Sequence, residues 1–238
     1  MPGTPLARRA PARGAPPTGP IIVPALLLRR GHVCLPGAEG PVVARRGSGQ
    51  GYDVFEVLDQ LSPHYPFLYL VDLDGLERND PQLEYIQELS RDMPLWVDSG
   101  VRHADQAIDV IVAGAQKAVL SSAYLRGPKE LRRAWRLTTE LVFEIETVQG
   151  RTEPVDESWG SADPAALARV ARDVGIGSVV LSARGEEVDW TMVGALAQGG
   201  PTWVDGSFSP RDALQLATAH AAGGIFHLDE VLANMDKP

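Results

Sequence analysis

One short segment of this chain occurs twice, and this repeat constrains the fold more than any other feature. Residues 96–105 read WVDSGVRHAD and residues 203–212 read WVDGSFSPRD, at an offset of 107 positions. The ungapped match continues through Ala107/Leu214, Gly114/Ala221, Val119/Phe226, Leu120/His227 and Ser122/Asp229. Each copy has the pattern of a short apolar strand, a polar turn, an amphipathic helix and a second strand. A repeat of nearly half the chain length predicts a fold built from two similar halves.

The rest of the chain alternates strand-like and helix-like segments at a similar spacing. Apolar segments of strand length occupy residues 21–28, 67–73, 95–98, 118–121, 141–147, 178–182, 202–205 and 225–228. Apolar residues have helical spacing over residues 53–61, 81–90, 103–113, 128–137, 164–174, 190–197, 210–219 and 229–234. Asp80 and Asp163 are the expected N-caps of the helices that begin at residues 81 and 164. Two further short strands are expected over residues 31–35 and 41–45.

Eight strands that are each followed by a helix predict right-handed parallel units. We therefore expect an α/β fold, a (β/α)8 TIM barrel with an internal half-barrel duplication. An open doubly wound sheet is the alternative, but no G-x-G-x-x-G fingerprint follows the first strand. Residues 1–20 are rich in Pro, Ala, Gly and Arg and contain no acid. We expect a disordered leader there and a single barrel domain over residues 21–238.

Composition narrows the class of protein. The chain has 238 residues, 44% of them hydrophobic, which is enough for one substantial core. Apolar runs fall well short of the roughly 20 residues that span a bilayer. The formal charge of -9 disfavours nucleic acid as a partner, because phosphate contacts need clustered Lys and Arg. A single cysteine, Cys34, excludes an internal disulfide. We expect a cytoplasmic protein that binds a small-molecule metabolite and neither nucleic acid nor membrane.

Several segments resemble one family of barrels. Residues 22–26 (IVPAL) with Arg30-Gly31 are similar to the opening of the histidine-biosynthesis isomerase family; residues 70–75 (LVDLDG), 99–102 (SGVR) and 118–122 (AVLSS) resemble its second strand, its Gly-Gly-Val-Arg turn and its fourth strand. Members convert a phosphoribosyl-formimino aminoimidazole carboxamide ribotide from the aldose to the ketose form. The resemblance implies the same half-duplicated TIM barrel for this chain.

The positions that the resemblance marks as functional are changed here. The family's aspartate on the first strand falls on Leu27, which transfers no proton, and the aspartate on the fifth strand falls on Glu146. The turns that bind two phosphates in the family read Asp98-Ser99-Gly100, Ser121-Ser122, Asp205-Gly206-Ser207 and Leu228-Asp229. Carboxylates in these turns repel a phosphate dianion, so we expect a reaction other than that of the histidine pathway. Similar but separate relatives are associated with methanopterin-linked one-carbon metabolism.

The carboxyl ends of the strands form the active-site face of such a barrel, and side-chain alternation decides which residues face inward. In residues 142–146 (VFEIE), Phe143 and Ile145 belong against the helices, so Glu144 and Glu146 face the barrel. The same alternation turns Asp98 inward together with Trp96, and Asp205 together with Trp203. Asp72 shares the phase of Leu70 on its strand, and His227 is expected at the mouth if it follows the phase of Leu120.

Converging carboxylates repel one another unless they are protonated, paired with Arg78, Arg102 or Arg184, or gathered around a cation. We predict Glu146, Asp98 and Asp205 as catalytic acid/base groups. The predicted substrate-binding residues are Asp72, Arg102, Glu144, Ser122 and His227. The alternative is that each acid only caps a strand end and accepts backbone N–H bonds from the following turn.

The sequence has no metal-ligand spacing of Cys and His, and we predict neither a metal site nor a cofactor. Clustered carboxylate oxygens are nevertheless compatible with a divalent cation such as Mg²⁺ or Ca²⁺, or with an amine substrate. We expect an isomerase-like or lyase-like enzyme. The alternatives are a non-catalytic barrel that binds a ligand or a partner protein, and a metal-dependent biosynthetic enzyme for a methanopterin-type one-carbon cofactor. The oligomeric state stays open.

Overall fold

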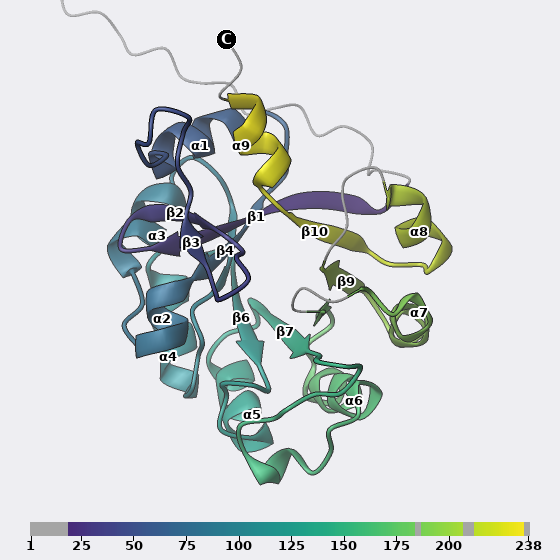
Figure 1. Cartoon of the computed structure of the whole chain (residues 1–238). Coiled ribbons are helices and arrows are strands. Elements are labelled where there is room, and N and C mark those ends of the chain that lie inside the picture. Colours follow the sequence, from purple (N-terminus) through teal and green to yellow (C-terminus); the bar gives the residue numbers. More distant parts are fainter. Residues whose placement is uncertain (1–18, 184–186, 207–211, 236–238) are drawn as a thin grey trace, which may run out of the picture.

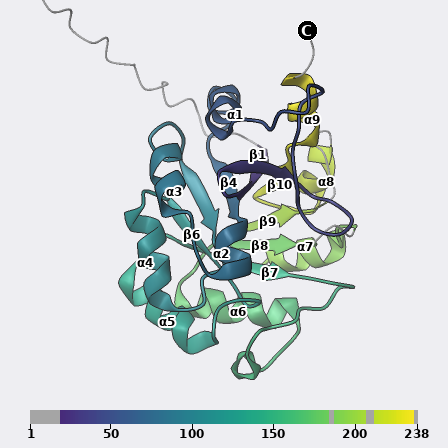
Figure 2. The same ribbon diagram turned by 60° about the vertical axis from the view of Figure 1, so that its left-hand side comes forward.

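The computed structural model describes residues 19–183, 187–206 and 212–235, and within them the chain forms the predicted (β/α)8 barrel (Figures 1 and 2). Eight parallel strands pair in the order β1-β4-β5-β6-β7-β8-β9-β10, and β10 also pairs with β1, which closes the sheet. These strands are β1 (Ile21–Arg29), β4 (Leu68–Asp72), β5 (Leu95–Asp98), β6 (Lys117–Ser121), β7 (Leu141–Glu146), β8 (Val179–Ser182), β9 (Thr202–Asp205) and β10 (Gly223–His227).

Helices surround the barrel and join consecutive strands (Figures 1 and 2). They are α1 (Val54–Leu61), α2 (Leu73–Arg78), α3 (Leu83–Leu89), α4 (Ala104–Val112), α5 (Pro128–Leu137), α6 (Pro164–Val174), α7 (Trp190–Ala197), α8 (Ala213–Thr218) and α9 (Asp229–Met235). In the part of the chain that the structure describes, none of these helices is long and apolar enough to cross a membrane. Residues 1–18 of the leader expected over residues 1–20 lie outside the described residues.

Two short strands extend the sheet at β1. Strand β2 (His32–Leu35) pairs antiparallel with β1, and β3 (Val42–Val43) pairs antiparallel with β2. The turn from β1 to β2 uses two left-handed residues, Arg30 and Gly31, with φ values of 49° and 75°. At Gly31 a Cβ would lie 2.0 Å from the Tyr85 hydroxyl, so only glycine leaves room for α3 at this turn.

The strands alternate between two apolar layers. One phase of each strand, such as Leu70, Val97 and Phe143, packs against the helices in the large outer core. The other phase fills the inside of the barrel, where ten buried residues form a separate cluster. These are Val23, Ala25, Phe67, Tyr69, Trp96, Val119, Val142, Val180, Trp203 and Ile225. This alternation decides which side chains at the strand ends point into the mouth.

Three aromatic rings form the floor of the barrel. Phe67 stacks on Trp96 at 4.4 Å between ring centroids, and Trp96 meets Trp203 edge-to-face at 4.9 Å. Gly223 makes room for this floor, because a Cβ there would lie 2.3 Å from the Trp203 ring. The two tryptophans of the repeat therefore pack on each other and on Phe67, as fillers of the barrel interior.

The structure confirms the two-half design but changes the register of the repeat. Gly223 pairs beside Trp203 on β9, and Lys117 pairs beside Trp96 on β5. In β6 and β10 the equivalent residues are therefore 106 positions apart rather than 107, which makes His227 the counterpart of Ser121. The ungapped alignment with Leu120 was wrong at this point, because Leu120 packs in the outer core. His227 shares instead the inward phase of Ile225.

The helix caps show where the observed helices differ from the predicted ones. Asp163 caps α6 as predicted, accepting from the amides of Ala165 and Ala166. Asp80 was expected to cap the helix over residues 81–90, but the corresponding helix, α3, has Gln82 as its cap residue. Helix α2 was not predicted. It begins directly after β4 and ends at Asn79, which adopts a left-handed conformation with φ of 57°.

Asp72 is the residue that holds α2 in place, and its predicted position at the mouth is wrong. Its strand phase is that of Leu68 and Leu70, which face the helices. The fully buried carboxylate accepts from the amides of Asp74 and Gly75 at 3.1 and 3.2 Å. It also accepts from the Gln82 amide at 2.7 Å and from Gln82 Nε2 at 3.0 Å. Burial raises the pKa of this carboxyl, while the Gln82 hydrogen bonds lower it.

Replacing Asp72 should therefore destabilise the fold. Asp72→Ala removes an acceptor from several buried donors, and we expect it to lower the free energy of unfolding by about 2–4 kcal/mol. Asp53→Ala is the matched control, because Asp53 caps α1 in the same way from an exposed position. Urea unfolding measures both losses. Equal losses in the two variants would contradict the structural role assigned to Asp72.

Candidate active site at the mouth of the barrel

The carboxyl ends of the strands bring a group of polar side chains together. Asp98, Glu144, Glu146 and Asp205 share the inward phase of Trp96, Val142 and Trp203 on their strands. Phe143 and Ile145 pack in the outer core, as the alternation predicted. Asp98 and Glu144 are each 4% exposed and Glu146 is 9% exposed, so these carboxylates are largely removed from water. The roles predicted for them remain predictions.

Two serine–carboxylate pairs connect neighbouring strands across the mouth. Ser121 Oγ on β6 donates to Glu146 Oε1 on β7 at 3.2 Å. Ser182 Oγ on β8 donates to Asp205 Oδ2 on β9 at 2.8 Å. Each serine hydroxyl thus orients the carboxylate of the next strand. The serines follow from the inward phase of β6 and β8, but the sequence analysis did not assign them to these acids.

His227 completes this side of the mouth. Its Nε2 lies 3.8 Å from Asp205 Oδ1, and the two side chains are 28% and 15% exposed. Apart from this contact, Asp205 Oδ1 has no hydrogen-bond partner among the described residues. Among the described residues at the strand ends, Asp205 and His227 thus form a partly exposed pair of polar side chains.

Tyr69 is the residue that sequence reasoning missed. It lies inside the barrel on β4, is 1% exposed, and its hydroxyl has no hydrogen-bond partner among the described residues. Burial raises the pKa of Tyr69 well above its ordinary value of 10.0. Negative charges raise it further, and the contributors in decreasing order are Glu144, Asp98, Asp205 and Glu146. The phenol thus stands neutral among the four carboxylates.

In the turns after β5 and β6, backbone amides donate hydrogen bonds to side chains of the same turn. The Gly100 amide donates to Asp98 Oδ1 at 3.1 Å, and the Ala123 amide donates to Ser121 Oγ at 3.1 Å. Amides of this kind are what a phosphate needs at such a turn. The carboxylate of Asp98 therefore takes up one of the backbone donors of this turn.

Two further predicted substrate-binding residues, Arg102 and Ser122, lie in the turns after β5 and β6. Arg102 donates to the carbonyls of Gly75, Leu76 and Gly100 and to the Asn79 side chain, which ties the end of α2 to the turn after β5. Ser122 is buried, and its carbonyl accepts from the Val155 amide at 2.9 Å. Of the other arginines proposed as partners of the acids, Arg78 pairs with Asp74, and Arg184 lies outside the described residues.

The position of the family's first-strand acid is apolar here. Leu27 follows the inward phase of Ala25 and packs with Cys34 and Leu73 in a small buried cluster. No proton donor or acceptor therefore projects from this place on β1. The acids of the mouth come from β5, β7 and β9 instead.

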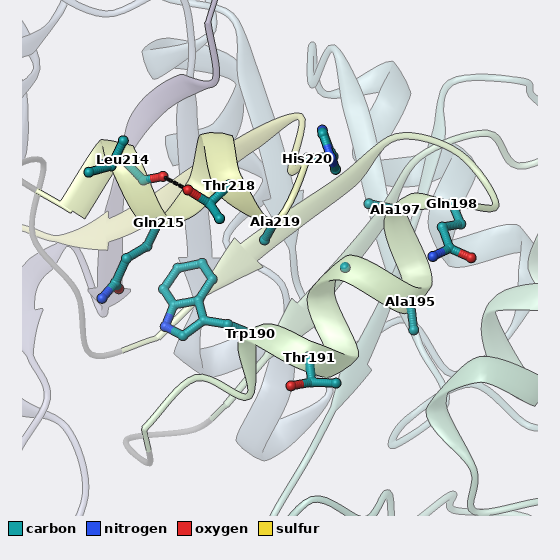
Figure 3. Close-up of a pocket in the computed structure, with 11 residues that line it drawn as sticks. Trp190, Thr191, Ala195, Ala197, Gln198, Leu214, Gln215, Thr218, Ala219 and His220 are labelled. Atoms are coloured by element: carbon teal, nitrogen blue, oxygen red, sulfur yellow. Dashed lines mark hydrogen bonds between the residues drawn. The ribbon is translucent and has the colours of Figure 1, made fainter.

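The described residues contain no group of three or more His, Cys, Asp or Glu that could hold a metal ion. A groove of about 840 Å³ does occur, but on the outside of the barrel between α7 and α8 (Figure 3). Trp190 and Leu214 line it from the two helices, and its lining residues in the described chain include no acid. We therefore place the candidate site at the mouth, where the ionisable groups converge.

Comparisons with known proteins agree with this architecture. A family model described as Histidine biosynthesis protein matches residues 21–186. Three curated relatives carry the name 1-(5-phosphoribosyl)-5-((5-phosphoribosylamino)methylideneamino)imidazole-4-carboxamide isomerase. They come from Methanococcus vannielii, Methanococcus maripaludis and Thermomicrobium roseum, with identities of 25%, 22% and 33% over 48%, 58% and 48% of this chain. The matched regions cover 51%, 66% and 48% of these relatives, so the chain spans about half the length of two of them.

The state of Tyr69 gives a prediction for alkaline pH. Its folded-state pKa is raised, so its contribution to stability is present below about pH 10 and is lost as the pH rises further. Tyr69→Phe should therefore lose less stability than the wild type between about pH 9 and pH 11. Urea unfolding at each pH measures this difference.

A spectroscopic titration checks the same assignment. The chain has 5 tyrosines, and the phenolate absorbance that appears near pH 10 should be equal in the wild type and in Tyr69→Phe. A loss of about one fifth of this amplitude in the variant would mean that Tyr69 ionises like an exposed tyrosine.

Proposed function

The chain belongs to the histidine biosynthesis protein family, and on this premise we propose that it is a small-molecule enzyme of isomerase or lyase type. The observation that carries the proposal is Glu146, which stands at the inward end of β7 and receives a hydrogen bond from Ser121. A largely buried and oriented carboxylate is suited to take a proton from a substrate carbon and return it elsewhere. Asp98 or Asp205 is the partner that handles the second proton.

The proposed substrate differs from the ribotide named for the relatives. One support is Leu27, which stands on β1 where the resembling family has an aspartate. The other is Asp98, whose carboxylate accepts a hydrogen bond from the Gly100 amide. A bisphosphorylated ligand would bring its charge next to Asp98 and Asp205, and repulsion at short range in a partly dry site costs several kcal/mol. The proposal is therefore a changed substrate on the family's barrel.

A non-catalytic barrel that binds a ligand or a partner protein is the second candidate. It is favoured by Leu27, because a two-acid mechanism with one group on β1 has lost that group. The link to methanopterin-type one-carbon metabolism rests on the family resemblance alone. Pterin-type compounds therefore belong in the ligand panel, together with amines and phosphorylated sugars, each with and without a divalent metal.

Catalysis is tested by proton exchange, which does not require the substrate to be known. In D₂O the wild type should incorporate deuterium into a substrate of the panel, followed by NMR. Glu146→Gln should lower this exchange at least about 100-fold, since general acid/base groups contribute 10²–10⁴, and its melting temperature should stay nearly unchanged. Glu140→Gln is the control, because Glu140 pairs with Lys117 away from the mouth. Equal exchange in Glu146→Gln and wild type would favour the non-catalytic candidate.

The altered turns give a separate prediction about anions. Inorganic phosphate and phosphorylated sugars at millimolar concentration should leave the melting temperature unchanged in a thermal-shift assay. The physical reason is that the carboxylates of Asp98 and Asp205 stand where the anion would bind. A response to phosphorylated compounds alone would contradict the proposed change of substrate.

A further inference from the structure

Polar side chains on three consecutive strands contact one another at the mouth of the barrel. Ser182 Oγ on β8 donates to Asp205 Oδ2 on β9 at 2.8 Å. The other oxygen of the same carboxylate, Asp205 Oδ1, lies 3.8 Å from Nε2 of His227 on β10. Asp205 therefore links a hydroxyl to an imidazole. We call Ser182, Asp205 and His227 the serine–aspartate–histidine row.

We propose that His227 is the second acid/base group of the site and that it exchanges a proton with a carbonyl oxygen of the substrate. Asp205 and Ser182 are positioning residues in this assignment, because they act through the imidazole. The inference rests on the proposed function and deepens it in two respects. It names the group that handles the second proton, and it assigns the substrate to carbonyl compounds that carry a hydrogen on the neighbouring carbon.

The first support is the register of the strands. Ser182 pairs beside Glu146 on one side and beside Asp205 on the other. Asp205 pairs beside Ile225 on β10, so His227 stands one inward step nearer the opening than this level. Glu146 and His227 are therefore the ends of one arc over β7 to β10, and they can address two different atoms of one substrate.

The second support is the state of the atoms in the row. Asp205 Oδ1 and His227 Nδ1 are buried and have no hydrogen-bond partner among the described residues. Buried polar atoms of this kind are rare and mark places where a partner binds. The distance of 3.8 Å is that of an ion pair, and such contacts commonly shorten when a substrate binds. A proton on Nε2 faces Asp205, which leaves Nδ1 for the substrate.

The surroundings of His227 favour an oxygen as the atom that meets Nδ1. Its neighbour on β1 is Ala25, and both Ala25 and Leu27 present apolar side chains on the inward phase of that strand. An imidazole donates when it is protonated and accepts when it is neutral. This behaviour suits an oxygen that alternates between carbonyl and hydroxyl. The side chain is 28% exposed, so a ligand at the mouth can reach it.

The proposed step moves two protons and conserves electrons. The Glu146 carboxylate takes the proton from the carbon next to the carbonyl group. The electron pair of the broken C–H bond forms a C=C bond, and the π electrons of the carbonyl group move to its oxygen. The imidazolium of His227 gives this oxygen a proton. The product is a neutral enol, with Glu146 protonated and His227 neutral. In D₂O the reverse step returns deuterium to the carbon.

The test is deuterium exchange in D₂O, followed by NMR, with dihydroxyacetone and glyceraldehyde as neutral carbonyl probes. His227→Ala should lower the exchange rate at least about 100-fold, as expected for the loss of a general acid. Imidazole added to the medium should restore about tenfold or more of the rate in His227→Ala, and none in Glu146→Gln, because it replaces only the missing imidazole. His64→Ala, at an exposed position, is the control and should match the wild type.

Asp205→Asn tests the positioning role. Alone it should lower the exchange rate at least about tenfold, whereas in the His227→Ala background it should cost less than about twofold, because no imidazole is left to orient. Ser182→Ala should follow the same pattern with a smaller loss. If His227→Ala does not fold, His227→Gln replaces it in this measurement. Equal losses from Asp205→Asn in both backgrounds would overturn the proposal.

The outcomes separate this inference from the proposed function. Exchange that needs Glu146 but is equal in the wild type and His227→Ala would overturn the role of His227 and leave the proposed function intact. A loss in His227→Ala that imidazole does not restore would also overturn that role, because a structural contact has the same effect. Exchange with amines or pterin-type compounds alone would overturn the carbonyl class. The lack of exchange with any compound would refute both.

Discussion

Pairing between β1 and β10 is the interaction on which the candidate site depends. The ladder runs from Ile21 beside Gly223 to Ala25 beside His227 and joins the two ends of the barrel sequence. In an open sheet these strands would be opposite edges, and the acids of β5, β7 and β9 would stand in a row. Closure turns one face of every strand toward a common axis. The carboxylates meet because the ring is closed.

The same closure sets an energetic conflict inside the barrel. Its lower part is an aromatic floor of Phe67, Trp96 and Trp203, and its upper part holds acids that have lost much of their water. Removing a carboxyl group from water opposes folding unless its hydrogen bonds and charge are satisfied. The large outer core between strands and helices contributes the stability that offsets this cost. Residues that weaken a fold in this way are expected where a ligand binds.

Side-chain alternation predicted the inward acids because the other phase of their strands is apolar. On β7, Phe143 and Ile145 pack against the helices, so Glu144 and Glu146 must face the inside of the barrel. The same argument failed on β4, because both faces of this strand carry apolar residues, such as Leu70 and Tyr69. The alternation there does not show which face points into the barrel. Asp72 was therefore assigned to the wrong face, and no role was predicted for Tyr69. Only the closed barrel places its hydroxyl among acids from distant strands.

The repeat that predicts the fold also shows where the two halves have diverged. Asp98 and Asp205 occupy equivalent positions, yet Asp98 accepts from the Gly100 amide of its own turn, whereas Asp205 accepts from Ser182 on the neighbouring strand. The first arrangement stiffens a turn. The second leaves Asp205 Oδ1 toward His227, on the more exposed side of the mouth. The two aspartates thus have different contacts among the described residues, although they occupy equivalent positions of the repeat.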